Sequence, residues 1–306
     1  MFDTSISFPG LGITINPSDG FTIFGFTVKW YGVIIALGLC LAVVYCTRRI
    51  KQFGLTADDI FDMLPYALVA AILGARAFYV VFKWDQFFGP GIPWYKCLDI
   101  RSGGLAIYGG VIGAAIAIAV YTKIKKQKIT PYLDVVGLGL LIGQSIGRWG
   151  NFFNREAFGG YADNVFAMRI NQAYGHGLEG MDVLLQKAQE GGYAGYIQVH
   201  PTFLYESVWN AIGFILLHFL SKKRKFDGEI FLGYLAWYGL GRMFIEGLRA
   251  DSLYIGPLRV SQWIAGITLL LAVGLLVYNI LFAKHTPEDM LVNRVKAQQE
   301  EANADE

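Results

Sequence analysis

Charged residues are scarce in this chain of 306 residues. Lys, Arg, Asp and Glu make up 16% of it, whereas hydrophobic residues make up 54%. Soluble domains carry about 25% charged residues, so the composition excludes an ordinary soluble protein and indicates an integral membrane protein. The formal net charge of +2 is too close to neutral to indicate a nucleic-acid partner.

Cysteine and histidine are also rare. The three cysteines, Cys40, Cys46 and Cys97, form no Cys-X-X-Cys pair, and the four histidines show no ligand spacing. We therefore expect the cysteines to be small packing residues, and we expect no metal site.

Long apolar runs dominate what remains. Seven segments each come near the ~20 residues that a helix needs to cross hydrocarbon. They are residues 30–46, 60–82, 105–121, 132–146, 202–220, 230–245 and 260–282. The fourth and sixth are short, and glycine- and aromatic-rich sequence extends both. The 37 glycines agree with a bundle, because small residues let membrane helices approach closely. We predict an all-α integral membrane protein with seven transmembrane helices.

Short basic loops predict the orientation. Lys and Arg cluster at 48–51, 123–128 and 222–225, after the first, third and fifth segments. Such loops stay in the cytoplasm, so the N-terminus is expected outside and the C-terminus inside. The predicted parts are an extracytoplasmic arm (1–29), helices one to four (30–154), a small extracytoplasmic cap (155–200), helices five to seven (201–283) and a cytoplasmic tail (284–306). Residues 179–190 look helical within the cap, and the tail is expected to form a short helix.

The densest polar cluster follows the fourth segment, in the run GRWGNFFNREAFGG at 147–160. It holds Arg148, Asn151, Asn154, Arg155 and Glu156 among glycines and aromatics. Ions are costly in hydrocarbon, so this cluster must face water or a polar ligand.

The predicted topology brings other polar residues to the same level, the outer leaflet. They are Tyr31, Arg76, Tyr108, Glu206, Arg242 and Glu246. A transporter is expected to carry its polar site near the midplane, whereas a one-sided site suits an enzyme acting on outer-leaflet lipid or on an exported protein. A transporter or channel for a small anion remains the alternative. An intramembrane protease is disfavoured because the apolar segments hold no GxSG serine and no paired aspartates.

Four polar residues of the sixth segment share one helical face. Tyr238, Arg242, Glu246 and Arg249 recur at i, i+4, i+8 and i+11. One interpretation is an Arg242–Glu246 pair that only neutralises itself. The other adds Arg76 and Arg148, so that guanidiniums outnumber carboxylates and favour a bound anion such as phosphate.

The run at 147–160 resembles the signature of the prolipoprotein diacylglyceryl transferase family, roughly G-R-x-G-N-F-x-N-x-E-x-x-G. Five further pieces agree in order: WYG at 30–32, LGARAFYV around Arg76, RSGGLAIYGG at 101–110, HPTFLYE at 200–206 and YGLGRMFIEGLR at 238–249. The resemblance implies that a diacylglyceryl group moves from phosphatidylglycerol to the lipobox cysteine thiol of an exported preprolipoprotein. A thioether forms and glycerol phosphate leaves. It also implies a bacterial cytoplasmic-membrane location and no cofactor.

The resemblance also implies roles for individual residues. The catalytic candidates are Arg148, Asn151, Glu156, Arg242 and Tyr108. The substrate-binding candidates are Tyr31, Arg76, Asn154, Gly159, His200, Glu206, Tyr238 and Glu246. Among them, arginines are expected to bind the phosphate, asparagines and Tyr31 to hold the headgroup, and glutamates to orient the arginines. Gly159 is expected to let backbone approach the lipid.

Two positions depart from the family pattern. Many members carry His-Gly-Gly where this chain has Tyr108 followed by two glycines. Tyr108 is either a base whose pKa nearby arginines lower or a residue that positions substrate. We favour positioning, because a thiol with a pKa of about 8.5 needs little help. His200 is the alternative base, although its place before Pro201 also suits a helix start. The second departure is Phe203, where relatives often have Gln.

Overall fold

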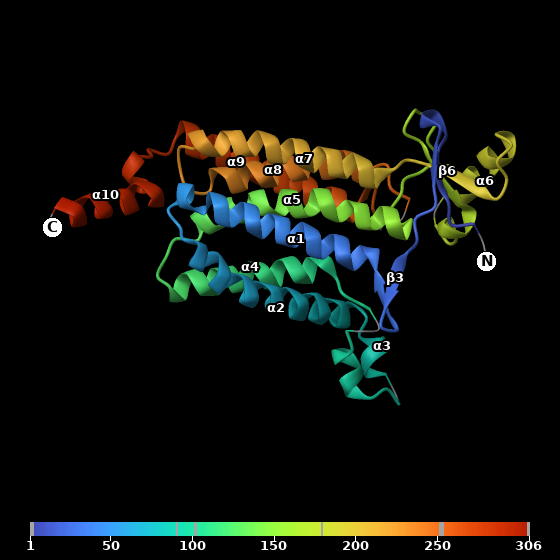
Figure 1. Ribbon diagram of the computed structural model, residues 1–306, viewed down its shortest axis with the longest axis horizontal. Coiled ribbons are helices and arrows are strands. Elements are labelled where there is room, and N and C mark those ends of the chain that lie inside the picture. The colour runs from blue at the N-terminus through green and yellow to red at the C-terminus, as the bar shows by residue number, and fades with distance from the viewer. Residues whose placement is uncertain (1–2, 90, 101–102, 179, 251–253, 305–306) are drawn as a thin grey trace. The chain divides into compact units, whose positions relative to one another are not determined.

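The computed structural model describes residues 3–89, 91–100, 103–178, 180–250 and 254–304. Long helices dominate these residues (Figure 1). Arg101 and Glu179, which the sequence analysis included in a motif and in the helical piece of the cap, lie outside the described residues.

Each of the seven predicted apolar segments is helical. The long helices are α1 (Trp30–Arg49), α2 (Ala57–Phe82), α4 (Ile107–Ile124), α5 (Thr130–Asn154), α7 (Thr202–Leu220), α8 (Glu229–Glu246) and α9 (Val260–Leu281). Local chemistry sets some of their ends. For α2, the Thr56 side chain accepts from the Asp59 N–H while the Asp59 carboxylate accepts from the Thr56 N–H, a capping box.

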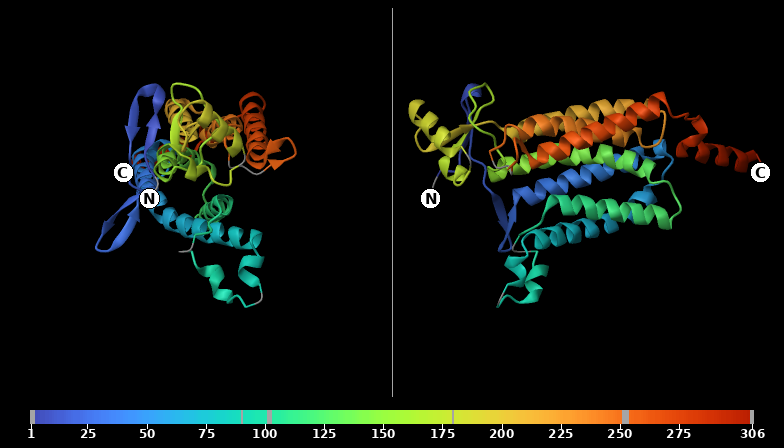
Figure 2. Two further views of the ribbon diagram at one scale, coloured as in Figure 1. Left: turned by 90° about the vertical axis from the view of Figure 1, so that its right-hand side faces the viewer. Right: turned by 180° about the vertical axis from the view of Figure 1, so that it is seen from behind.

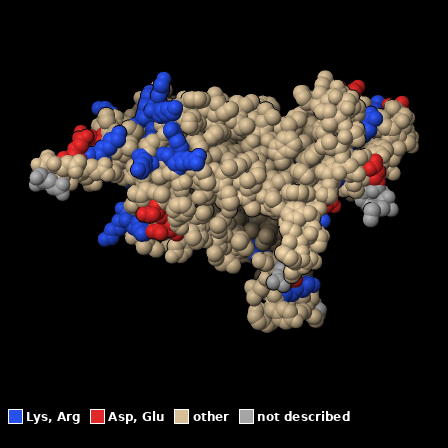
Figure 3. All heavy atoms as spheres, viewed as in Figure 1, with Lys and Arg blue, Asp and Glu red and all other residues tan. Residues whose placement is uncertain are grey.

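Five helices of the described chain are long and apolar enough to cross a membrane, namely α1, α2, α4, α7 and α9. Their flanks present exposed apolar side chains, and Leu270 of α9 is 74% exposed. In Figure 3 the visible flanks of the long helices are tan, and Lys and Arg atoms gather near helix ends. Exposing so much apolar surface to water is unfavourable, so the chain is a multi-pass membrane protein.

Helices α5 and α8 are less apolar for a specific reason. The 18 residues of α8 include Glu229, Arg242 and Glu246, and α5 carries Asp134, Gln144 and Arg148. At a rise of 1.5 Å per residue both are still at least ~27 Å long. The mean hydropathy of these two helices is lower because they carry polar side chains into the protein interior.

The chain divides into two compact units, residues 1–45 with 136–287 and residues 46–135 with 288–306. In the second unit α2 packs tightly on α4, and a side chain on Gly74 or Gly109 would collide with the other's backbone carbonyl. The predicted tail helix is also there as α10 (Leu291–Ala304), and its Val292 backbone packs on Gly54.

In the first unit a tryptophan pair locks α7 to α8. The Trp209 and Trp237 rings stack with centroids 4.3 Å apart. Each indole N–H donates to the backbone carbonyl of the other residue, at 3.0 and 2.9 Å. Gly213 and Gly241 leave room for the rings, since a Cβ at either position would overlap an indole. The relative register of α7 and α8 is therefore fixed.

The N-terminal arm and the cap form one small folded body, with strands that the sequence analysis did not predict. Four strands make an antiparallel sheet in the order β2 (Ile13–Ile15), β1 (Ile6–Phe8), β5 (Met168–Asn171) and β6 (Tyr196–Val199). The arm thus pairs directly with the cap, and Figure 2 shows the blue arm strands beside the yellow-green cap. The helical piece of the cap is α6 (Met181–Glu190). A hairpin, β3 (Gly20–Ile23) and β4 (Phe26–Lys29), leads into α1.

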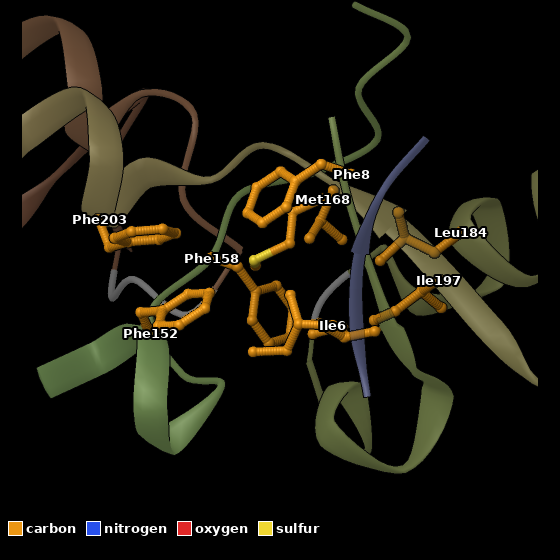
Figure 4. Close-up of a cluster of buried hydrophobic side chains, with 10 residues drawn as sticks. Ile6, Phe8, Phe152, Phe158, Met168, Leu184, Ile197 and Phe203 are labelled. Atoms are coloured by element: carbon orange, nitrogen blue, oxygen red, sulfur yellow. The ribbon is translucent and has the colours of Figure 1, made fainter. Parts of the chain in front are cut away.

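A hydrophobic core joins this body to the ends of α5 and α7. Figure 4 shows Ile6 and Phe8 of the arm close to Met168, Leu184 and Ile197 of the cap. Phe152 of α5 and Phe203 of α7 belong to the same cluster, with ring centroids 5.0 Å apart. Phe203 therefore serves packing, and the cap holds the helix ends from which the polar cluster projects.

Candidate anion-binding site

Charged residues from three helices of the first unit meet at neighbouring helix ends. Arg148 lies in the last two turns of α5, Glu206 in the first turns of α7, and Arg242 with Glu246 in the last turns of α8. They converge because α5 and α8 end at this level while α7 begins there. The sequence analysis expected these four residues at one level, and the fold brings their side chains into contact.

Glu206 is the centre of the cluster. Its Oε2 lies 2.5 Å from Arg148 Nη2, and its Oε1 lies 2.9 Å from Arg242 Nη1. Arg242 also reaches Glu246, with Nη2 2.6 Å from Oε2. One carboxylate from α7 thus holds guanidiniums from α5 and α8, which makes Glu206 and Glu246 the residues that orient the arginines.

Arg249 is a third arginine of this cluster. It lies beyond the end of α8, so it does not continue the helical face that the spacing indicated. A turn nevertheless brings it to 3.9 Å from Glu206 Oε1 and 3.9 Å from Glu246 Oε2. Three guanidiniums therefore surround two carboxylates, a formal excess of one positive charge.

Burial divides the cluster into a deep acidic part and a shallower basic part. The side chains of Glu206 and Glu246 are 5% and 3% exposed, whereas those of Arg148 and Arg242 are 20% and 16% exposed. An incoming anion would meet guanidinium edges before it met carboxylate oxygens. Planar guanidiniums suit phosphate oxygens, which accept two parallel N–H bonds.

Small polar contacts hold α5 against α7 just below the cluster. Ser145 Oγ donates to the Ser207 carbonyl at 2.9 Å, and Ser207 Oγ donates back to the Ser145 carbonyl at 2.8 Å. Trp149 Nε1 also donates to Ser207 Oγ at 3.2 Å. The sequence analysis did not single out these residues, because serines inside apolar helices carry no pattern that names their partner.

The asparagines extend the cluster toward the cap. Arg148 Nη1 lies 3.5 Å from Asn151 Oδ1, and the amide nitrogens of Asn151 and Asn154 donate to Glu156 Oε1 at 3.0 and 3.2 Å. Glu156 is exposed and fixes the two amides rather than an arginine. The Tyr31 ring lies over Gly150, where a Cβ would come within 2.8 Å of it, so Tyr31 borders the same stretch of α5.

Gly159 and His200 tie the cap to the end of α8. The Gly159 N–H donates to the His200 carbonyl at 2.9 Å, and the Gly160 N–H donates to the Leu248 carbonyl at 2.9 Å. A Cβ on Gly159 would lie 2.6 Å from the Leu248 carbonyl oxygen. Gly159 is thus required by close backbone packing. The His200 ring lies 3.3 Å from Tyr205 Oη, and partial burial lowers the pKa of its imidazole.

Two further predicted residues, Arg76 and Tyr108, belong to the second unit, and their place beside Arg148 stays a prediction. Arg76 is 6% exposed and donates to the backbone carbonyls of Lys96, Cys97, Gly103 and Gly104 at 2.7–3.0 Å. These contacts support a role in holding the backbone at those four residues. Tyr108 lies in the first turn of α4 and is 40% exposed.

Tyr238 lies two turns before Glu246 on α8 and stacks on Tyr234, with centroids 5.9 Å apart. Tyr234 in turn accepts from Gln144 of α5 at 3.0 Å. The tyrosine stack therefore links α8 to α5 beneath the arginines, and the predicted substrate contact of Tyr238 stays a prediction.

Fold and site together define a multi-pass helical membrane protein with a cluster of three arginines and two glutamates at neighbouring helix ends. Comparisons with known proteins then identify the family. The family described as prolipoprotein diacylglyceryl transferase matches residues 19–278. The chain belongs to this family.

Individual relatives are similar over nearly their whole length. The phosphatidylglycerol–prolipoprotein diacylglyceryl transferase of Enterococcus faecalis is 39% identical over 282 residues, covering 91% of this chain and 95% of the relative. The proteins of the same name from Clostridium botulinum and Bacillus cytotoxicus are each 39% identical. They cover 87% and 84% of this chain and 98% and 87% of the relatives, respectively.

Proposed function

We propose that this chain transfers the diacylglyceryl group of phosphatidylglycerol to the thiol of a lipobox cysteine in an exported prolipoprotein. The names of its relatives support the reaction, and the arginine cluster supports the chemistry. A sulfur–carbon bond forms at the glyceryl carbon, the bond from that carbon to the phosphate oxygen breaks, and glycerol phosphate leaves. The family does not support the alternative of a small-anion transporter.

The excess of guanidinium over carboxylate is the observation that carries this proposal. As the glyceryl C–O bond breaks, negative charge grows on the departing phosphate. Arg148 and Arg242 are held by carboxylates and keep 20% and 16% of their side chains exposed, so they offer donors to that charge without reorganisation. Preorganised donors of this kind are worth several kcal/mol of barrier, about 3–4 kcal/mol for a single one.

The remaining cluster residues have supporting roles in this proposal. Glu206 and Glu246 keep the guanidiniums in place, which spares the substrate the cost of ordering them. Asn151, Asn154 and Tyr31 border the end of α5 and are suited to hydrogen-bond the glycerol headgroup. Glu156 fixes both amides by accepting from them.

The proton of the thiol needs an acceptor, because the thiolate is the nucleophile. Tyr108 and His200 are the two candidates. If Tyr108 is the base, Tyr108→Phe lowers the rate strongly and high pH relieves the loss, since the thiol then ionises unaided. If Tyr108 positions substrate, the loss is independent of pH.

We also infer the topology on which this function depends. Helices α5 and α8, although less apolar than the five others, complete seven spans, with the N-terminus outside a bacterial cytoplasmic membrane. The basic loops after α1, α4 and α7 support this orientation. The arginine cluster then faces the outer leaflet, where an exported lipobox peptide arrives.

The deciding experiment incubates the purified protein with phosphatidylglycerol and a lipobox peptide and measures the product by mass spectrometry. We expect a peptide with a thioether-linked diacylglyceryl group and one equivalent of glycerol phosphate. A peptide whose cysteine is replaced by serine is the control and should stay unmodified. Failure of the folded protein to form the thioether would refute the proposal.

A further inference from the structure

A recess lies in the first unit where the cap meets the end of α8. Its volume is about 320 Å³, and its wall includes Gly160, Tyr161, Val183, Leu184, Arg249 and Arg259. Leu184 and Arg259 are buried, whereas Val183 is 55% exposed. The recess therefore has a buried floor and a rim on the surface of the cap.

The described wall of this recess is positively charged. Arg249 and Arg259 are part of it, and none of the described residues that line it is Asp or Glu. The first turn of α6 also lines it through Val183 and Leu184, so the partial positive charge of that helix N-terminus adds to the potential. Asp182 lies on the same turn but is exposed and outside the wall.

Arg249 connects this recess with the ion-pair cluster. Arg249, which belongs to the wall of the recess, has guanidinium nitrogens 3.9 Å from Glu206 Oε1 and 3.9 Å from Glu246 Oε2. Glu206 in turn holds Arg148 and Arg242. An anion that leaves Arg242 thus meets Arg249 next, and Arg259 lies in the wall of the same recess.

The size of the recess limits its occupant. Sites for small ligands have volumes of about 300–1,000 Å³, so this one lies at the lower end. It admits a small anion with a short polar tail and excludes two acyl chains. The Gly160 N–H donates to the Leu248 carbonyl at 2.9 Å, which fixes the backbone in this part of the wall.

We propose that this recess binds the glycerol phosphate moiety, a small phosphate monoester with a polyol tail. The proposal rests on the function proposed above, in which glycerol phosphate is the leaving group. It assigns Arg249 and Arg259 to that group after the glyceryl C–O bond breaks, and it gives the cap a purpose in product release. The same moiety also exists as the headgroup of the lipid, so the test must separate the two sources.

The test measures inhibition by added glycerol phosphate and the KM for phosphatidylglycerol in Arg259→Gln. Loss of a charge-assisted hydrogen bond weakens the affinity for glycerol phosphate by roughly ten- to hundredfold. We expect the inhibition constant of glycerol phosphate to rise by that factor while thioether formation continues. An unchanged KM assigns the recess to the released product, and a KM that rises in parallel assigns it to the lipid headgroup as well.

A second variant guards against misfolding, because Arg259 precedes α9. Val183→Trp narrows the exposed rim and leaves both arginines in place, and it should raise the inhibition constant in the same direction. Arg169→Gln is the matched control. Arg169 lies in the cap, donates to Gln198 at 2.8 Å and stacks over Tyr193, and it is outside the recess.

The outcomes separate this proposal from the proposed function. If the wild-type protein makes no thioether, the proposed function fails. If the wild-type protein turns over but glycerol phosphate neither inhibits it nor binds, the recess does not take this ligand. Equal inhibition constants in the wild type, Arg259→Gln and Val183→Trp would likewise overturn the assignment.

Discussion

Two groups of arginines differ in the partners of their guanidiniums. Arg148 and Arg242 pair with carboxylates and keep an exposed edge, at 20% and 16% of the side chain. Arg155, only seven residues after Arg148, is fully buried and donates to the carbonyls of Thr4, Pro17 and Phe153 and to the Asp19 carboxylate. Arg76 likewise donates to four backbone carbonyls.

A ligand-binding arginine is expected to differ from a structural one in the partners of its guanidinium. Backbone carbonyls use the N–H groups of Arg76 and Arg155 to shape a loop and to fasten the N-terminal arm. Carboxylates hold Arg148 and Arg242, whose side chains stay partly exposed. Arginine in a polar motif is therefore not evidence of a binding site by itself. The hydrogen-bond and ion-pair partners of the guanidinium determine whether donors remain for a ligand.

The largest effect is expected when an arginine of the cluster is removed. Arg148→Ala and Arg242→Ala should each lower the rate of thioether formation by about 10²–10³-fold, because each removes a donor to the departing phosphate. The assay is single-turnover transfer from phosphatidylglycerol to a lipobox peptide, with thermal unfolding as a check on folding. Near-normal rates in both variants would contradict the phosphate assignment.

Arg155→Gln should affect the fold more than the chemistry. The change leaves the carbonyls of Thr4 and Pro17 without their donor, and buried acceptors that lose a partner cost about 1–3 kcal/mol each. We expect a lower melting temperature and faster hydrogen exchange in β1 and β5. The rate of transfer per folded molecule should fall by less than roughly tenfold. A loss of rate as large as that of Arg148→Ala, with normal exchange, would place Arg155 in the site instead.

Arg76→Gln distinguishes a structural role of Arg76 from the lipid-binding role that the sequence predicts. Its donors hold the backbone carbonyls of Lys96, Cys97, Gly103 and Gly104. Without them the Cys97 thiol should react faster with a maleimide by about fivefold, the factor that corresponds to ~1 kcal/mol. The measurement uses a background of Cys40→Ala and Cys46→Ala, in which Cys97 is the remaining thiol. Unchanged labelling together with a raised KM for phosphatidylglycerol would favour the direct contact.

Hydropathy was sufficient to predict that each of the seven apolar segments is helical, because an apolar run of that length has few other structures open to it. It was insufficient for the sheet that joins arm and cap. The strand Ile6–Phe8 has three residues, and its partner at Met168–Asn171 is more than 150 residues away. Period-two patterning needs longer strands than these to be recognised, so the sequence does not indicate that the arm pairs with the cap.

The part of the candidate site that lies on a single helix could be predicted from the spacing of its residues along the sequence. The i, i+4 pair Arg242–Glu246 is present as expected. Glu206 as the centre of the cluster was not evident, because its partners come from two other helices and only the fold fixes that register. The helical spacing extended one face as far as Arg249, whereas α8 ends at Glu246 and a turn brings Arg249 to the carboxylates.

The smallest effect concerns His200, which lies outside both groups of arginines. Burial lowers the pKa of its imidazole, so the folded protein disfavours the protonated form. The contribution of His200 to stability is therefore complete above the unfolded pKa of about 6.5 and is lost as the pH falls below it. His200→Asn should flatten the fall in melting temperature between pH 7 and pH 5 by no more than a few degrees.

The same variant then decides between the two roles of His200. If the residue only begins α7 and packs on Tyr205, the melting temperature changes its pH dependence while the pH profile of transfer keeps its shape. A histidine that accepts the thiol proton must be neutral to work, so wild-type transfer would lose rate below its pKa and His200→Asn would abolish that acidic limb. An unaltered limb in His200→Asn, with full rate at neutral pH, leaves Tyr108 as the remaining candidate and makes His200 a residue that joins cap to helix.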